Sequence, residues 1–304
     1  MFNWFKPKIY NSGYLPEKDG HKVYFMEAGN PKGEPVLIFH GGPGGSAKIK
    51  HTYSFDRKKY RMILFDQRGG GKSLPAGEIK NNTTQKLLED AERLLDYLNI
   101  KGEIIVKGGS WGSTLALLFA IKNPKRVKKL FVSQIFLADK AGVDWLENQS
   151  GLFYPDMLEK LKNESKGSQS LAKTFAEMIN SDNLVNQVKA VSLYGRYEWV
   201  LGKLNPSMEF GEITADDIAS SRVYINYAAK DFMLEEGYIM NNIAKIQHIP
   251  TLIVHNRLDF VCPVQGAYDL HKAMPKSKLV IVPDIGHGSD LLQKTIIQET
   301  KAFL

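Results

Sequence analysis

A glycine-serine segment between two apolar runs constrains this chain more than any other feature. Residues 108–112 read GGSWG and fit G-x-S-x-G, a pattern that places a serine on a tight turn between a strand and a helix. The preceding run Glu103–Lys107 (EIIVK) predicts a strand, and the following run Ser113–Ile121 (STLALLFAI) predicts a buried helix. Small residues at Gly108 and Gly112 would let both elements pack closely. An ordinary glycine-serine turn is the alternative for the motif alone, but the flanking elements favour a reactive serine.

A reactive serine needs a histidine as base and a carboxylate to orient it, in the chain order Ser, Asp or Glu, His. The apolar run 251–255 (TLIVH) predicts a strand, and Asp259 lies in the loop after it. The next predicted strand, 278–282, leads to His287. Ligand sites in parallel sheets lie at the carboxyl ends of the strands. We therefore predict that Ser110, Asp259 and His287 converge at that edge.

Two other carboxylates compete for the role of the acid. Asp284 and Asp290 lie close to His287 in sequence, but they share its own loop. Asp259 is favoured because it follows a separate strand that can hold it. The other six of the seven histidines are interpreted as structural, since only His287 follows a strand after the acid.

A glycine-rich loop predicts the groups that stabilise a developing negative charge. Val36–Phe39 (VLIF) predicts a buried strand, and it leads into HGGPGG at 40–45. Glycines there let backbone N–H groups approach an oxyanion, and the N–H of Trp111, directly after the serine, is the expected second donor. A flexible glycine-rich turn is the alternative, and the preceding strand argues against it.

Two glycine patterns do not indicate a nucleotide. Residues 69–73 read GGGKS, but the phosphate loop of nucleotide-binding proteins needs a glycine where Asp66 stands. Neither GGPGG nor GGSWG gives the G-x-G-x-x-G fingerprint of dinucleotide-binding folds. The sequence has no cysteine-histidine cluster and no H-E-x-x-H motif that would indicate a metal. We therefore expect no cofactor.

These segments resemble the proline iminopeptidases, which are serine exopeptidases of the α/β-hydrolase superfamily. The resemblance rests on HGGPGG at 40–45, DQRGGGKS at 66–73, GGSWGSTLAL at 108–117, HIPTLIVHNRLDFVCP at 248–263 and the glycine-histidine pair at 286–287. It implies an α/β-hydrolase fold, with a mostly parallel central sheet flanked by helices and an inserted helical cap. It also implies that Ser110, Asp259 and His287 form a catalytic triad. By the same resemblance, Gly42 and Trp111 line the oxyanion hole.

The resemblance further implies where a peptide binds. In this family the first acid of the cap closes a W-x-x-W-E segment, which here reads YGRYE, so Glu198 is the matching acid. A second family glutamate is replaced by Tyr224, and a family arginine is replaced by Ser133. Phe136 matches a wall of the proline-ring pocket. Cys262 matches the family's cysteine-proline dipeptide, which implies a thiol near the site.

The expected function is a serine hydrolase that forms an acyl-enzyme and releases N-terminal proline from short peptides. The alternative is a carboxylesterase or lactonase, including one for acyl-homoserine lactones. Tyr224 and Ser133 favour it, because an uncharged substrate needs neither of the charges they replace. A non-catalytic binding protein of the same fold is the third hypothesis, and the three filled triad positions argue against it. The expected partner is a small molecule or a short peptide.

Periodicity predicts the organisation of the chain. With 304 residues, of which 43% are apolar, it can form one domain with an insertion. Strands are expected at 22–29, 35–39, 61–65, 103–109, 128–134, 251–255 and 278–282, and helices at 83–99, 266–273 and 290–303. Asn82 and Gln85 resemble a capping box for the first helix. Residues 138–240 are helical and polar, so we predict a cap there and a core from 1–137 and 241–304.

Charge and composition limit the cellular location and the binding partners that we expect. The single cysteine excludes an intramolecular disulfide, and the start MFNWFKPKIY lacks the apolar stretch of a secretion signal. No run of about 18 apolar residues suits a membrane span, so a cytoplasmic protein is expected. The net charge of +7 comes from lysines scattered among acids, without a nucleic-acid motif, so nucleic-acid binding is not expected.

Overall fold

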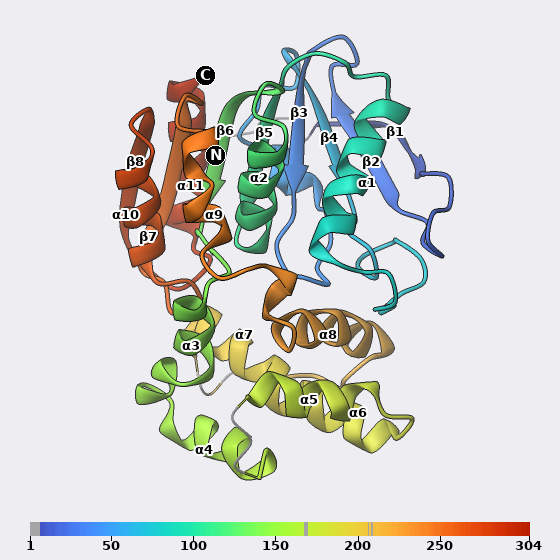
Figure 1. Cartoon of the computed structure of the whole chain (residues 1–304), viewed down its shortest axis with the longest axis vertical. Coiled ribbons are helices and arrows are strands. Elements are labelled where there is room, and N and C mark those ends of the chain that lie inside the picture. Colours follow the sequence, from blue (N-terminus) through green and yellow to red (C-terminus); the bar gives the residue numbers. More distant parts are fainter. Residues whose placement is uncertain (1–6, 167–169, 206, 208) are drawn as a thin grey trace.

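The computed structural model describes residues 7–166, 170–205, 207 and 209–304, so the first six residues of MFNWFKPKIY lie outside it. In these residues eight strands form one sheet in the order β1-β2-β4-β3-β5-β6-β7-β8 (Figure 1). The strands are β1 Ile9–Tyr14, β2 Tyr24–Gly29, β3 Glu34–Phe39, β4 Tyr60–Phe65, β5 Ile104–Gly109, β6 Val127–Ser133, β7 Thr251–Leu258 and β8 Ser277–Ile285. β2 pairs antiparallel with β1 and β4, and all other neighbours run parallel. The predicted α/β fold with a mostly parallel sheet is confirmed.

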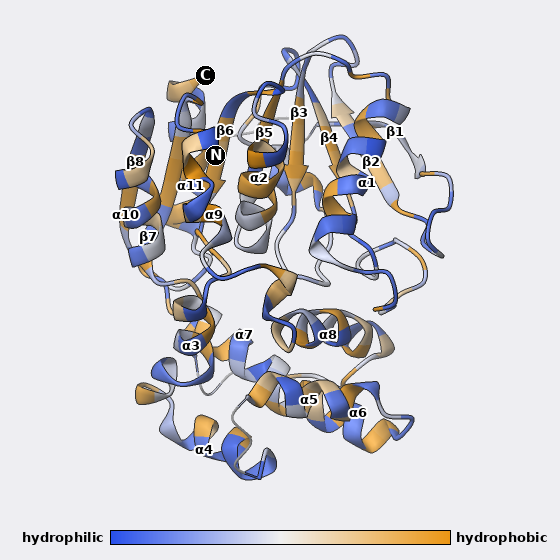
Figure 2. Cartoon of the chain, viewed as in Figure 1, coloured by the Kyte–Doolittle hydropathy of each residue, from blue (hydrophilic) through white to orange (hydrophobic). Residues whose placement is uncertain are grey.

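Both faces of the central sheet are covered. Residues 36–39 of β3 and 104–106 of β5 are apolar and buried, which is typical of parallel strands covered on both faces, and Figure 2 colours much of β3 as hydrophobic. One buried cluster contains side chains of α1 Thr84–Tyr97, α2 Trp111–Lys122 and α10 Val264–Ala273. The cluster on the other face contains Leu292 and Ile296 of α11 Asp290–Phe303. Residues 111–121 of α2 are all buried, which explains why this helix is apolar on every side.

Helices without strands fill the stretch between β6 and β7 in the described residues. They are α3 Lys140–Glu147, α4 Pro155–Glu164, α5 Leu171–Asn180, α6 Leu184–Ala190, α7 Arg196–Lys203, α8 Ala215–Ala228 and α9 Tyr238–Asn241. Short 3₁₀ or π turns lie at 49–52, 149–152, 191–195, 231–233 and 243–245. Figure 1 shows α3 to α8 grouped beyond one end of the sheet. Among the helices formed by described residues, none combines the length and apolar character that a bilayer crossing demands.

Two local features differ from the sequence expectations. The patterns do not predict β1, because this edge strand pairs only with β2 and its residues are mostly exposed, so no apolar alternation marks it. The capping box of Asn82 and Gln85 is wrong. Thr83 is the N-cap of α1, and its hydroxyl accepts the backbone N–H of Lys86. Asn82 is buried instead, and its amide donates to the backbone carbonyl of Arg68.

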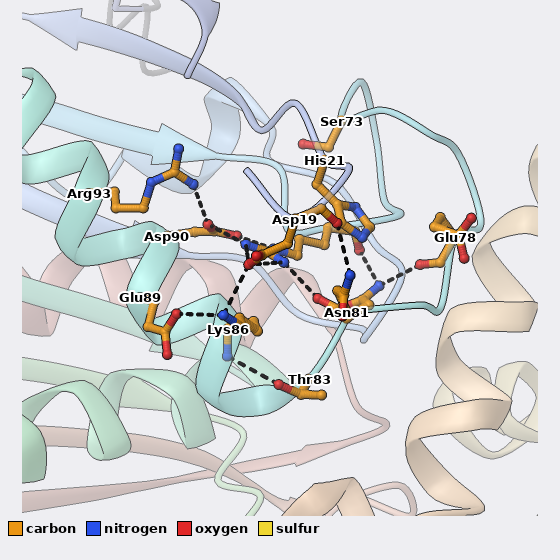
Figure 3. Close-up of polar contacts among 12 residues, drawn as sticks. Asp19, His21, Ser73, Glu78, Asn81, Thr83, Lys86, Glu89, Asp90 and Arg93 are labelled. Atoms are coloured by element: carbon orange, nitrogen blue, oxygen red, sulfur yellow. Dashed lines mark hydrogen bonds and ion pairs between the residues drawn. The ribbon is translucent and has the colours of Figure 1, made fainter. Parts of the chain in front are cut away.

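A buried ion pair fixes the DQRGGGKS segment after β4. The Nε of Arg68 lies 2.6 Å from Oδ2 of Asp90 in α1, and both side chains have 0% exposed surface. Figure 3 shows the polar contacts around this pair, in which Asp90 also meets Arg93 and Asp19 meets Lys86. Because Arg68 ties this segment to α1, the preceding residue Gln67 is held in place beside the candidate site.

Candidate active site

Ser110 lies at the sharp turn between β5 and α2, with φ 58° and ψ −134°. A positive φ is uncommon for a residue with a side chain, and such strain is typical of functional turns. Two glycines make the turn possible. A Cβ on Gly108 would lie 1.9 Å from the carbonyl oxygen of Gly112, and a Cβ on Gly112 would lie 2.4 Å from that of Phe39. The turn therefore holds the serine at the carboxyl end of β5 and the N-terminus of α2.

The structure brings together the three residues that the sequence analysis selected. The Oγ of Ser110 lies 2.9 Å from Nε2 of His287. The Nδ1 of His287 lies 2.8 Å from Oδ2 and 3.0 Å from Oδ1 of Asp259. The three residues follow β5, β8 and β7, at the carboxyl ends of these strands. The competing acids lie elsewhere, because Asp284 is in β8, where it accepts the backbone N–H of Ile285 and hydrogen-bonds to Ser289, and Asp290 begins α11.

The charges of the acid and the base depend on each other. Asp259 is buried, and its Oδ1 accepts the backbone N–H groups of Val261 and Cys262, each at 2.9 Å. Burial opposes the charged carboxylate, but the adjacent His287 keeps the pKa of Asp259 below its usual value. Burial also opposes the charged imidazole, but Asp259 keeps the pKa of His287 above its usual value. With Nδ1–H donating to the carboxylate, Nε2 is left to accept from the hydroxyl of Ser110.

His255, which the sequence analysis interpreted as structural, contacts the segment that carries the acid. Its Nδ1 accepts the N–H of Ile135 at 2.9 Å, so its Nε2 carries the hydrogen and donates to the carbonyl of Cys262 at 2.8 Å. Nε2 also lies 3.6 Å from Oδ2 of Asp259. Burial lowers the pKa of His255, which favours this neutral form. The thiol of Cys262 is buried near the site, and burial raises its pKa.

The HGGPGG loop lies against the serine turn. A Cβ on Gly41 would lie 3.3 Å from the Cβ of Ser110. Gly42 has a φ of 129°, which favours glycine, and it lines the cavity described below. No carbonyl among the described residues accepts the backbone N–H of Gly42 or of Trp111. The side chain of Trp111 is buried, so only its backbone is suited to meet a substrate.

Gln67 joins the glycine loop to the start of α2, a role that the sequence analysis missed. Its backbone N–H donates to Nε2 of His40 at 3.0 Å, and its side-chain amide donates to the His40 carbonyl at 2.9 Å. Its Oε1 accepts the indole N–H of Trp111 at 2.9 Å. One buried side chain thus fixes both backbone segments that carry the expected oxyanion donors. The sequence signal that could have indicated this role was the DQRG segment at 66–69, which contains Gln67.

A cavity of about 500 Å³ opens beside Ser110. Its walls come from residues at the carboxyl ends of the strands and from the helices inserted after β6. The inserted helices contribute Glu198, Trp199 and Lys203 of α7 and Ser220, Ser221 and Tyr224 of α8. The site is therefore formed by segments distant in sequence, with helices covering the carboxyl ends of the strands.

The predicted substrate-binding residues lie in different places. Glu198 and Tyr224 both line the cavity and hydrogen-bond to each other, and Ser133 lines it from the end of β6. Burial raises the pKa of Glu198 to about 7, although the charge of His287 and the Tyr224 hydroxyl act to lower it. Phe136 is not brought to this cavity. Its ring packs against Phe232, with the ring centroids 4.8 Å apart.

Gln134 is a further cavity residue without a predicted role. It has a φ of 50°, and its amide donates to the carbonyl of His287. The backbone N–H of His287 donates to the carbonyl of Gly202 in α7 at 3.0 Å. The histidine loop is therefore held by both the sheet edge and the inserted helices. The available signal was the position of Gln134 directly after β6.

The chain matches known hydrolases along most of its length. Residues 34–289 match the sequence model of the family described as alpha/beta hydrolase fold. A proline iminopeptidase of Arabidopsis thaliana is 39% identical over 289 residues, covering 92% of this chain and 76% of the relative. A proline iminopeptidase of Xanthomonas citri is 37% identical over 290 residues, covering 92% of this chain and 91% of the relative.

Solved structures share the fold at lower identity. An α/β-hydrolase enzyme from a Medee basin deep-sea metagenome library has a TM-score of 0.62 at 18% identity, covering 96% of each chain. An esterase from Exiguobacterium antarcticum has a TM-score of 0.59 at 20% identity, covering 95% of this chain and 98% of the other. These similarities concern the fold alone. Because the iminopeptidases match in sequence over nearly the whole chain, this protein is a hydrolase that belongs to the proline iminopeptidase family of the α/β-hydrolase superfamily.

Proposed function

We propose that this protein is a serine aminopeptidase that releases N-terminal proline from short peptides. The observation that carries the proposal is the hydrogen-bonded chain from Ser110 through His287 to Asp259, beside a cavity that also contains Glu198. The similarity to enzymes named proline iminopeptidases supports the same activity.

Acyl transfer begins when the Ser110 oxygen attacks the scissile carbonyl carbon and His287 takes the hydroxyl proton. Asp259 orients the imidazole and stabilises its positive charge. The backbone N–H groups of Gly42 and Trp111 bind the oxyanion of the tetrahedral intermediate. The imidazolium then protonates the leaving nitrogen as the C–N bond breaks, which leaves the proline acyl group on the serine. Water then attacks this ester while His287 takes its proton, the bond between the acyl carbon and the Ser110 oxygen breaks as the imidazolium returns the proton to that oxygen, and free proline leaves.

Glu198 binds the protonated imino group of the N-terminal proline. Its electrostatic interaction with His287 supports a position close to the reacting atoms, and Tyr224 holds the carboxyl through a hydrogen bond. A nearby cation favours the charged form of a carboxyl whose pKa is about 7, so substrate binding and ionisation of Glu198 assist each other. We further propose that residues 138–240, which carry both side chains, form a cap over the core.

An esterase or lactonase is a second candidate, and the cavity wall is the observation that favours it. Tyr224 and Ser133 line the cavity with uncharged hydroxyl groups, at the two positions where the family resemblance implies a glutamate and an arginine. An ester or lactone has no amino group that needs these charges. The triad chemistry would be the same for either substrate.

One comparison separates the two candidates. Purified protein is assayed with proline and alanine p-nitroanilides, short-chain p-nitrophenyl esters and acyl-homoserine lactones, using Ser110→Ala as the inactive control. Turnover of the proline anilide that collapses in Glu198→Gln supports the aminopeptidase. Ester or lactone turnover that is insensitive to Glu198→Gln, with no anilide turnover, supports the second candidate. Turnover that is unchanged in Ser110→Ala rejects both.

A further inference from the structure

The cavity has a positively charged wall that the proposed mechanism does not use. Lys107 lies in β5, three residues before Ser110, and it lines the same cavity. Its Nζ donates to the carbonyl of His51 at 2.9 Å and to Oγ of Ser54 at 2.8 Å. These contacts fix the ammonium group and use two of its three N–H donors. The exposed Lys50 adds a second positive charge to this part of the lining.

No carboxylate among the described residues balances the charge of Lys107, and its remaining partner is the ring of Phe55, whose centroid lies 5.7 Å from Nζ. Both hydrogen-bond acceptors are neutral, and burial is the only influence that shifts the pKa of Lys107, which falls to about 8. A described carboxylate close to the ammonium would act in the opposite direction. The group is still protonated at neutral pH. Enclosing a charge without a counter-ion is costly, and a bound anion removes that cost.

The order of the polar groups along the cavity matches a short peptide. Glu198 reaches the cavity from α7, beyond the end of the sheet, whereas Lys107 lies behind Ser110 along β5. Three residues of a strand span about 10 Å. A peptide of two or three residues presents an ammonium, a scissile carbonyl and a terminal carboxylate in the same order, within a similar length.

We propose that Lys107 binds the free C-terminal carboxylate of a short peptide whose amino terminus meets Glu198. This inference rests on the proposed aminopeptidase function and specifies its substrates as dipeptides and tripeptides with an unblocked carboxyl end. The ammonium is held by His51 and Ser54, so it recognises the carboxylate at one fixed place. Peptides with an amidated end offer no negative charge there and are poorer substrates.

The test compares each peptide acid with its own amide. Values of kcat/KM are measured for Pro-Gly, Pro-Gly amide, Pro-Gly-Gly, Pro-Gly-Gly amide and proline p-nitroanilide. The proteins are the wild type, Lys107→Met and, as a matched control, Lys272→Met, which removes a lysine on α10 outside the cavity lining. We expect the wild type to prefer at least one acid to its amide by about 10- to 150-fold, the range of a charged hydrogen bond. Lys107→Met should abolish this preference and keep anilide turnover, and Lys272→Met should change neither.

Two results overturn the proposal while leaving the proposed function intact. One is equal turnover of acid and amide at both lengths by the wild type. The other is an acid preference that persists in Lys107→Met. If Lys107→Met does not fold, as judged by its melting curve, Lys107→Gln is used in its place. A wild type that turns over neither the anilide nor any of the peptides rejects the proposed function, and this inference with it.

Discussion

Arg68 donates two hydrogen bonds to Asp90, from Nε to Oδ2 at 2.6 Å and from Nη2 to Oδ1 at 2.9 Å. A bidentate arrangement of this kind fixes orientation as well as distance. Arg68 directly follows Gln67, which contacts both the glycine loop and Trp111. The buried ion pair takes no part in the proposed reaction. Through Gln67, it nevertheless supports both backbone segments of the proposed oxyanion hole.

Removing one partner of this pair should strongly destabilise the protein. Asp90→Ala leaves the Arg68 guanidinium buried without its main counter-ion, and we expect the free energy of unfolding to fall by about 3–5 kcal/mol. Thermal and urea unfolding measure the change. The control is Glu92→Ala, also in α1, which breaks a partly exposed ion pair with Lys122 of α2 and should cost less than about 1 kcal/mol. Equal losses in the two variants would contradict the structural role assigned to Arg68.

The two candidate acids can be separated by matched substitutions. Asp259→Asn keeps the shape of the side chain but presents an amide to Nδ1 of His287, which disturbs the tautomer that the base needs. We expect kcat to fall by roughly 10⁴-fold, with little change in KM. Asp284→Asn alters a carboxyl at the end of β8 that hydrogen-bonds to the backbone N–H of Ile285 and to Ser289 rather than to His287, so kcat should stay within about twofold. Steady-state kinetics on the proline anilide decides, and a larger loss in Asp284→Asn would reverse the assignment.

Loss of the Glu198 charge should act mainly on substrates with a free amino terminus. Glu198→Gln retains a side chain of similar size but removes the charge that meets the imino group. We expect kcat/KM for proline p-nitroanilide to fall by about 10- to 150-fold, the range of a charged hydrogen bond. Any turnover of a neutral ester should change little. Glu212→Gln, an exposed acid before α8, serves as the control. Parallel losses on anilide and ester would show a general structural effect instead.

The pH dependence should show a loss of activity on the acidic side. His287 acts as base only when neutral, and its pKa is raised by Asp259, while the pKa of Glu198 is raised by burial to about 7. Both groups must be deprotonated, so kcat/KM for the proline anilide should rise as pH increases through about 7 and fall on acidification. In Glu198→Gln, ester hydrolysis should keep only the histidine transition. An anilide profile that is flat between pH 5 and 8 would contradict both assignments.

Sequence patterns predicted the parts of the fold and the site that depend on local order. Ser110, Asp259 and His287 could be selected because each follows an apolar strand run, and parallel strands end at a common edge. Such reasoning finds residues that lie directly after strands. It failed for β1, since an exposed edge strand carries no apolar alternation, and for Asn82, whose hydrogen bond to Arg68 comes from tertiary packing.

The remaining site residues depend on contacts that no periodicity encodes. Gln67, Gln134 and His255 act through hydrogen bonds to backbone groups far away in sequence. Lys107 stands in the strand before the serine, and only the folded structure brings it to the cavity wall. Phe136 was expected at the substrate pocket, but the turn after β6 directs its ring toward Phe232. Such contacts can be identified only in the folded structure.

A variant of His255 tests whether the orientation of Asp259 affects the rate of the reaction. His255→Leu fills a similar space but leaves two buried backbone groups, the N–H of Ile135 and the carbonyl of Cys262, without partners. Each unsatisfied group costs about 1–3 kcal/mol, so the melting temperature should fall. Because Cys262 also donates to Asp259, the acid loses its fixed orientation, and kcat should fall at least tenfold while KM for the anilide stays within about twofold. The control is His271→Leu, which removes a hydrogen bond to Ser277 away from the cavity and should leave kcat unchanged. A stability loss in His255→Leu without any loss of kcat would show that His255 supports the fold but does not position the acid.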